Sequence, residues 1–257
     1  MKLLSFRANW SSELFVGEPL YRDDSGQVYG DGASAVDRLG GDVKGKRILF
    51  LIHGYNVNYA GVIAAYCEVE ANLRKYRLLG PEAKYQDLVG VLWPGHTALG
   101  FAPAIYSANR TGDRLAAVLA QLRGCRITLE THSLGARVAL QAARVLRLEQ
   151  LILTSPAVSD TCFEPGREFS SQYARSVDVC YSQNDPVLGV WYRGFEWIAA
   201  AATLSSGSMA LGLTGPADPR KCPPAIHAED FSGYIRTHGG WASCAAFYRY
   251  WSSAAWL

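Results

Sequence analysis

The chain lacks the features that mark several protein classes. Its 257 residues carry a formal net charge of only +2, so neither nucleic acid nor an acidic membrane surface is an expected partner. We expect no integral membrane segment, because the longest uncharged stretch, 197–217, is rich in Ser, Gly and Ala and poor in Leu and Ile. Residues 1–7 contain no sustained apolar region or small-residue cleavage site, so they do not resemble a signal peptide.

Common metal, redox and phosphate motifs are also missing. None of the six cysteines belongs to a C-x-x-C pair, and the five histidines show no H-E-x-x-H spacing, so we expect no metal site. Without a signal peptide the cysteines are expected to be reduced and the protein cytoplasmic, unless an export signal lies outside this sequence. The stretch 40–46 has P-loop spacing, but Arg47 replaces the required Ser or Thr, and the stretch precedes a strand. We interpret it as a surface turn.

From residue 46 onward, apolar strand patterns alternate with helical periodicity. This alternation predicts an α/β fold with a mainly parallel, doubly wound sheet, helices on both faces and a site at the carboxyl ends of the strands. The length suits a single domain, 1–257, in which 1–45 forms a short antiparallel edge. The predicted strands are 47–52, 87–93, 125–130, 151–154 and 177–181, and the predicted helices are 59–76, 114–122 and one that begins after residue 134.

A serine lies where the third regular strand turns into a helix, in the sequence Thr131-His132-Ser133-Leu134-Gly135. On a tight turn of this kind the hydroxyl of Ser133 projects from the sheet, and the N–H of Leu134 faces the oxyanion that forms on attack at a carbonyl. The usual pattern is G-x-S-x-G. Thr131 stands at the first glycine position, where its β-branched side chain is expected to strain or relax the turn.

Three other segments supply what a serine nucleophile needs. His53-Gly54-Tyr55-Asn56 follows a buried strand, and the N–H of Tyr55 would be a second oxyanion donor. Asp185 comes just after the strand 177–181, where a carboxylate that orients a base belongs. His238 lies near the C-terminus, so the chain order is Ser, Asp, His.

These segments, with Trp93-Pro94-Gly95, resemble the α/β-hydrolase superfamily of serine esterases and lipases. The resemblance is to a bacterial branch with an HGYN- or HGFN-like strand end and an HSLG or HSMG elbow, and it covers roughly residues 47–250. It implies hydrolysis of a small-molecule carboxylic ester by a Ser133–His238–Asp185 triad, with no cofactor. His53, Gly54, Asn56, His132 and Trp191 are the expected substrate-site residues, although His53 and His132 are also expected to hold loops by hydrogen bonds.

Several alternatives stay open at this level. Asp160 and Asp178 compete with Asp185 for the role of the acid, and His227 and His96 compete with His238 for that of the base. The aromatic segment 187–215 is expected to form an acyl-pocket wall or lid, with ordinary core packing as the alternative. The same triad would serve an acyltransferase, and a catalytically silent scaffold that only binds ligands is the third hypothesis.

Overall fold

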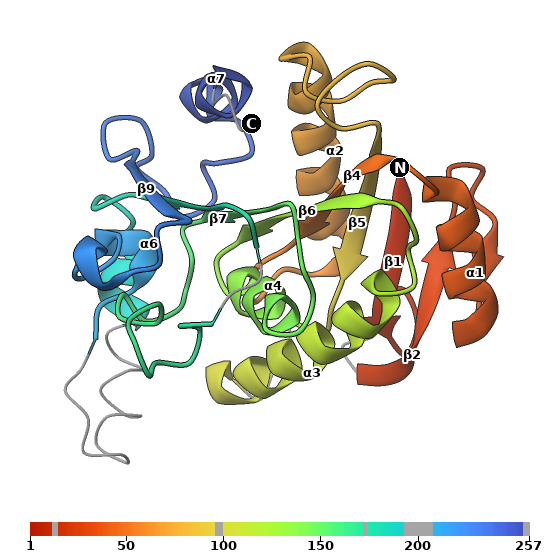
Figure 1. Cartoon of the computed structure of the whole chain (residues 1–257), viewed down its shortest axis with the longest axis horizontal. Helices are drawn as coiled ribbons and strands as arrows, with labels where there is room; N and C mark the ends of the chain where they lie inside the picture. Colours follow the sequence, from red (N-terminus) through yellow and green to blue (C-terminus); the bar gives the residue numbers. More distant parts are fainter. Residues whose placement is uncertain (12–14, 96–99, 172–173, 193–207, 254–257) are drawn as a thin grey trace.

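A mixed β-sheet runs through the middle of the molecule (Figure 1). The computed structural model describes residues 1–11, 15–95, 100–171, 174–192 and 208–253. Within them the sheet has nine strands in the order β3-β2-β1-β5-β4-β6-β7-β8-β9. The strands are β1 (Lys2–Arg7), β2 (Phe15–Arg22), β3 (Val28–Tyr29), β4 (Arg47–Ile52), β5 (Asp87–Leu92), β6 (Arg126–His132), β7 (Gln150–Thr154), β8 (Val177–Tyr181) and β9 (Ile226–Asp230).

The strands in the order β1-β5-β4-β6-β7-β8-β9 run parallel to one another, and β2 and β3 add an antiparallel edge beside β1. At the centre, Ile52 of β4 is in register with Val91 of β5 and with Thr131 of β6. The carboxyl ends of these strands therefore lie at one edge of the sheet, where the turns that follow β4 and β6 come together. The predicted fold class, parallel sheet with an antiparallel N-terminal edge, is confirmed.

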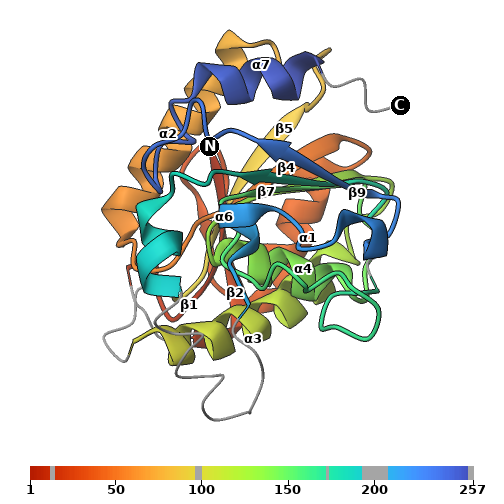
Figure 2. The same ribbon diagram turned by 90° about the vertical axis from the view of Figure 1, so that its left-hand side faces the viewer.

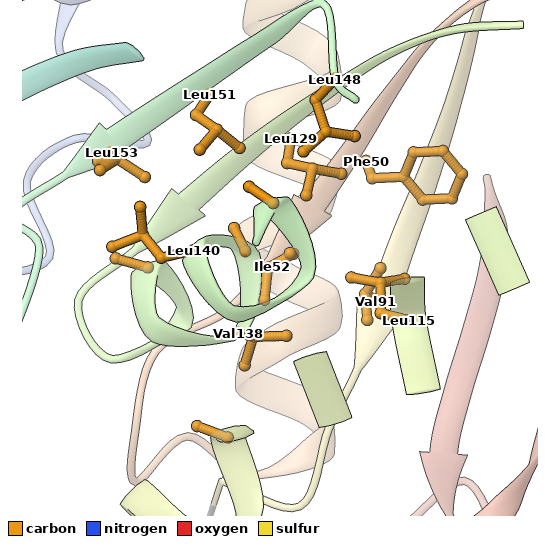
Figure 3. Packing of buried hydrophobic residues seen from close by; sticks show 14 of the residues in the cluster. Phe50, Ile52, Val91, Leu115, Leu129, Val138, Leu140, Leu148, Leu151 and Leu153 are labelled. Atoms are coloured by element: carbon orange, nitrogen blue, oxygen red, sulfur yellow. The ribbon is translucent and has the colours of Figure 1, made fainter. Parts of the chain in front are cut away.

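Helices cover both faces of the sheet. In Figure 2, α2 and α7 lie on one side of the strands, with α3 and α4 on the other. One buried cluster joins α1, α3 and α4 to the sheet; Val138 and Leu140 of α4, for example, pack near Ile52 and Leu129 (Figure 3). A second cluster lies under α2 and α7. The helices are α1 (Gly32–Val43), α2 (Tyr59–Lys75), α3 (Phe101–Leu119), α4 (Gly135–Ala143), α6 (Leu211–Thr214) and α7 (Ala245–Ser253), with a π-helix, η1 (Leu188–Tyr192), and a 3-10 turn, η2 (Pro219–Lys221).

The interpretation of residues 40–46 as a surface turn is wrong for its first half. Gly40 and Gly41 lie inside helix α1, which the Asp31 side chain caps by accepting a hydrogen bond from the N–H of Ser34 at 2.8 Å. The apolar residues of α1 that face the sheet are spaced at helical intervals, and this packing offsets the low helix propensity of the two glycines. The region 1–45 therefore holds a helix as well as the expected edge strands.

The described residues contain no helix long and apolar enough to cross a membrane. Within the same residues, no group of three or more His, Cys, Asp or Glu side chains is placed to hold a metal ion. Two sequence-based expectations lie outside the described residues. These are His96 as an alternative base and the part of the segment 187–215 that spans 193–207.

Two glycines inside helices give a matched test of how closely α3 packs against α4. A Cβ on Gly112 of α3 would lie 2.6 Å from the Cβ of Gln141 and 2.7 Å from the carbonyl oxygen of Val138, whereas one on Gly41 meets nothing within 4 Å. We expect Gly112→Ala to lower the free energy of unfolding by about 1–3 kcal/mol through overpacking. Gly41→Ala should raise it by about 0.5–1 kcal/mol. Urea unfolding measures both; equal effects would contradict the close α3–α4 contact.

Candidate active site

The turn between β6 and α4 places Ser133 in a left-handed conformation, with φ of 54°. Its backbone is fixed on both sides, because its N–H donates to the Thr154 carbonyl at 3.0 Å and its carbonyl accepts from Ala136 and Ala157, each at 3.1 Å. A Cβ on Gly135 would lie 2.5 Å from the carbonyl oxygen of His53. The glycine therefore allows the start of α4 to approach the end of β4, which brings the two turns together.

Thr131 does not distort this turn. It is a fully buried residue of β6, in register with Ile52 and Leu153 on the neighbouring strands. Its hydroxyl donates to the Ile152 carbonyl at 3.4 Å. The left-handed residue is Ser133 itself, so the first glycine position of the motif needs only an ordinary strand conformation here, which a β-branched residue adopts readily.

Asp185 and His238 are brought into direct contact. Nδ1 of His238 lies 2.7 Å from Oδ2 of Asp185, whose residue is only 1% exposed. Oδ1 of Asp185 accepts from the N–H groups of Val187 and Leu188 at 3.0 and 3.1 Å. Because a carboxylate can only accept, the His238 nitrogen in this bond carries the proton, and Nε2 on the other side of the ring is left as the basic atom.

Ser155 is a member of this network that the sequence did not reveal. Its hydroxyl donates to Oδ2 of Asp185 at 2.7 Å and accepts from Nε1 of Trp241 at 2.8 Å. Burial acts to raise the pKa of Asp185, but the hydrogen bonds from His238, Ser155 and Leu188 outweigh it and hold that pKa below its usual value. The carboxylate therefore stays ionised beside His238. A serine just after a strand carries no sequence signal that would have marked this role.

The His238 ring also lies against the residue that precedes Ser133. The rings of His132 and His238 are 4.6 Å apart, and Nε2 of His132 donates to the backbone carbonyl of His238 at 2.7 Å. Desolvation, helped by the neighbouring His238, lowers the pKa of His132 to about 3, so this ring is a neutral donor. Within the described residues the Ser133 hydroxyl makes no hydrogen bond. Such contacts are often long in ligand-free enzymes.

The two N–H groups expected to face an oxyanion are free to do so. Neither Leu134 nor Tyr55 donates a backbone hydrogen bond to any of the described residues. A Cβ on Gly54 would lie 3.0 Å from the Cβ of Ser133, so the turn that carries the Tyr55 N–H passes directly beside the serine. Donors that are already oriented at the place where charge develops lower a barrier without reorganisation.

His53 holds this turn from behind. Its Nδ1 donates to the Gly54 carbonyl at 2.8 Å, and its Nε2 accepts from the backbone N–H of Trp93 and from Nη2 of Arg7, both at 3.2 Å. Desolvation by burial, followed by the positive charge of Arg7, lowers the pKa of His53 to about 3. With both ring nitrogens committed to the protein, His53 supports the site without a free group for a substrate.

The remaining expected substrate-site residues differ in position. Gly54 lies against Ser133, as described above, whereas Asn56 is exposed in a left-handed turn with φ of 59°, and its N–H donates to the Gly95 carbonyl at 2.9 Å. The side chain of Trp191, named as a substrate contact, lies outside the described part of the chain.

The alternative acid and base are directed elsewhere. Asp178 and His227 are neighbours in the register of β8 and β9, and Asp178 is bonded to Gln150 under α7. His227 lies beside a cavity lined by the first residues of β4 and β6, at the amino ends of the strands, whereas Ser133 follows the carboxyl end of β6. Asp160 is buried, and its N–H donates to the Met209 carbonyl at 2.9 Å. Among the described acids and bases proposed from the sequence, Asp185 and His238 form a hydrogen-bonded pair whose histidine ring lies against that of His132, the residue before Ser133.

A cavity of about 190 Å³ lies behind the His238 loop, between α2 and α7. Its wall is mainly apolar, but it includes Glu130 of β6, which is 8% exposed and accepts a hydrogen bond from Thr154 at 3.3 Å. Burial raises the pKa of Glu130 to about 8, against the smaller opposing effect of Thr154. Glu130 is therefore a neutral acid at pH 7, a feature that its position inside a strand did not predict.

The mainly parallel sheet with an antiparallel N-terminal edge and helices on both faces is that of an α/β-hydrolase fold. The chain belongs to the family described as "Alpha/beta hydrolase of unknown function (DUF900)", whose model matches residues 33–193. The matched stretch contains Ser133 and Asp185 and ends before His238. No curated protein matches the chain.

The fold is also similar to solved structures at low sequence identity. Lipase B from Aspergillus fumigatus is 14% identical with a TM-score of 0.48, covering 82% of this chain and 52% of the lipase. The product of lin2722 from Listeria innocua is 11% identical with a TM-score of 0.46, covering 82% and 94%. Trichoderma reesei cutinase in complex with a C11Y4 phosphonate inhibitor is 14% identical with a TM-score of 0.30, covering 48% and 65%. The chain thus spans about half the length of the Aspergillus lipase.

The neutral carboxyl of Glu130 gives a stability prediction with a definite sign. Between the ordinary pKa of 4.5 and about 8, the unfolded chain loses this proton while the native protein keeps it, so stability falls as pH rises. Glu130→Gln has no such loss. In urea unfolding, the free energy of unfolding of the variant relative to that of wild type should rise by about 2–3 kcal/mol from about pH 5 to about pH 7.5.

The exposed Glu82→Gln is the matched control for this measurement, and its stability should follow that of wild type across the same pH range. If Glu130→Gln also ran parallel to wild type, Glu130 would be ionised in the native protein and its burial would not govern its pKa.

Proposed function

We propose that the protein is a serine hydrolase that cleaves carboxylic esters through Ser133, His238 and Asp185. The observation that supports this most strongly is the setting of the His238 ring. One nitrogen is bonded to the buried Asp185 at 2.7 Å, and the ring lies 4.6 Å from that of His132, the residue next to Ser133. A base oriented by an acid beside a serine on a left-handed turn is the arrangement that nucleophilic acyl transfer requires.

In the proposed first step the Ser133 oxygen attacks the ester carbonyl carbon, and Nε2 of His238 takes the hydroxyl proton. Asp185, kept ionised by its hydrogen bonds, stabilises the imidazolium that results. The carbonyl oxygen becomes an oxyanion and accepts hydrogen bonds from the N–H groups of Leu134 and Tyr55, each worth about 3 kcal/mol of barrier. The C–O bond to the alcohol then breaks, His238 returns the proton to the alcohol, and the acyl group stays on Ser133.

The second step repeats this chemistry with water. His238 removes a proton from a water molecule that attacks the acyl-enzyme, the tetrahedral intermediate uses the same two N–H groups, and Ser133 leaves with the proton from His238. An alcohol in place of water would give transfer rather than hydrolysis. A series of p-nitrophenyl esters of increasing acyl length, assayed with and without added alcohol, therefore measures both the acyl preference and the acceptor.

The nucleophile can be identified by covalent labelling. An organophosphonate should add once to the wild-type protein, at Ser133, and mass spectrometry of peptides locates the adduct. Ser155 is a built-in control, because it is also buried and left-handed, with φ of 42°, yet its hydroxyl is committed to Asp185. Ser133→Ala should take up no label. An unlabelled Ser133 in the wild-type protein would refute the proposed mechanism.

The base is tested by a pair of histidine variants. His238→Ala should reduce kcat/KM for p-nitrophenyl esters by about 10⁴-fold or more, because the serine loses its proton acceptor. His227→Ala removes an exposed histidine of β9 and should stay within about twofold of wild type. The reverse result would assign the base to His227 and would separate Asp185 from the chemistry.

A further inference from the structure

A second cavity, of about 580 Å³, opens at the amino ends of the strands. The charged residues in its wall are four cations and one carboxylate: Arg47, Lys84, Arg126, Arg175 and Glu149. Its volume is that of sites that hold metabolite-sized ligands, which is about 300–1,000 Å³. Since the whole chain has a net charge of only +2, this concentration of positive charge is a local property of the cavity.

Two of the cations are neighbours in the sheet. Arg47 begins β4 and Arg126 begins β6, and the two residues are register partners on these adjacent parallel strands. Like charges side by side on neighbouring strands destabilise a sheet unless a counter-charge lies between them. Among the described residues, neither arginine forms an ion pair. The structure thus presents two guanidinium groups at the same cavity, and no carboxylate in the described part of the chain is paired with either.

Arg47 is held in place by the protein. Its Nε and Nη2 donate to the backbone carbonyls of Lys84 and Ala83 at 3.1 and 2.8 Å. These two bonds fix the plane of the guanidinium and leave further N–H donors, since the group has five in all. A donor that is already oriented loses little conformational entropy when a ligand binds.

The other charges of the cavity do not cancel its positive sign. Glu149 lies 3.4 Å from Arg175 and so neutralises one cation. Burial lowers the pKa of Lys84 to about 8, partly offset by the carboxylate of Asp178, which lies behind the cavity wall. An anion in the cavity would favour the charged form of Lys84. Because the four cations of the wall outnumber its one carboxylate, the cavity carries a net positive charge.

We propose that this cavity is a second ligand site, which binds a small molecule carrying a phosphoryl group. Phosphoryl oxygens suit it because arginine recognises them with paired, charge-assisted hydrogen bonds, and because a divalent anion matches the excess of cations. The site is distinct from the proposed ester site. Arg126 is the first residue of β6 and Ser133 follows the last, so the two lie about 20 Å apart along the strand.

Isothermal titration of the wild-type protein with inorganic pyrophosphate tests the proposal directly. We expect saturable one-to-one binding that weakens as salt is raised. The double variant Arg126→Gln/Arg175→Gln should bind at least about tenfold more weakly, since each lost charge-assisted hydrogen bond costs affinity. Both arginines are exposed, so their replacement should leave the fold intact. Circular dichroism with thermal melting verifies that the double variant keeps the wild-type fold.

The control is a second double variant with the same change in charge, Arg114→Gln/Arg167→Gln, at exposed positions outside the cavity wall. It should bind pyrophosphate as wild type does. Equal losses in both double variants would reduce the effect to net charge, and no binding by the wild-type protein would overturn the proposal. Glycerol 3-phosphate and vesicles containing phosphatidic acid separate two sources of the phosphoryl group. Binding to the vesicles alone would overturn a small-molecule site.

Discussion

The buried carboxylate of Asp185 is the constraint around which the site is organised. An ion that is 1% exposed must have its oxygens satisfied, and here the donors come from His238, Ser155 and the backbone after β8. Ser155 in turn is bonded to Trp241, which packs under α7. The requirement to solvate one charge thus ties the ends of β7 and β8 to the loop that carries the histidine, and any change in that loop is felt at the carboxylate.

The central part of the fold was predictable because its sequence patterns are strong. Strand β4 is an apolar run buried on both faces, and the apolar spacing of α2 has no competing signal. Ser133 could be proposed as the nucleophile because a serine between a buried strand and a helix has a defined geometry. Asp185 and His238 were predictable as residue types in a chain order, but their contact depends on loop conformations that no local pattern specifies.

What the sequence did not predict has physical reasons of its own. Helix α1 was missed because Gly40 and Gly41 lower helix propensity, and only its packing against the sheet overrides this. Strand β9 is an edge strand that is largely exposed, so it lacks the alternation of a buried strand. The neutral state of Glu130 arises from helices α2 and α7, which are distant in sequence and close over it only in the folded chain.

The left-handed backbone of Ser133 also has a consequence for how such a chain would change over generations. A residue other than glycine in this conformation lowers the stability of the fold by roughly 1–2 kcal/mol. Glycine at the same position would restore that stability without moving the neighbouring strands. Selection for stability alone would therefore drive this position toward glycine, and only a use for the hydroxyl opposes that drift. A duplicated copy of the protein that no longer used the Ser133 hydroxyl would be expected to replace this serine with glycine early, and its fold would become more stable as a result.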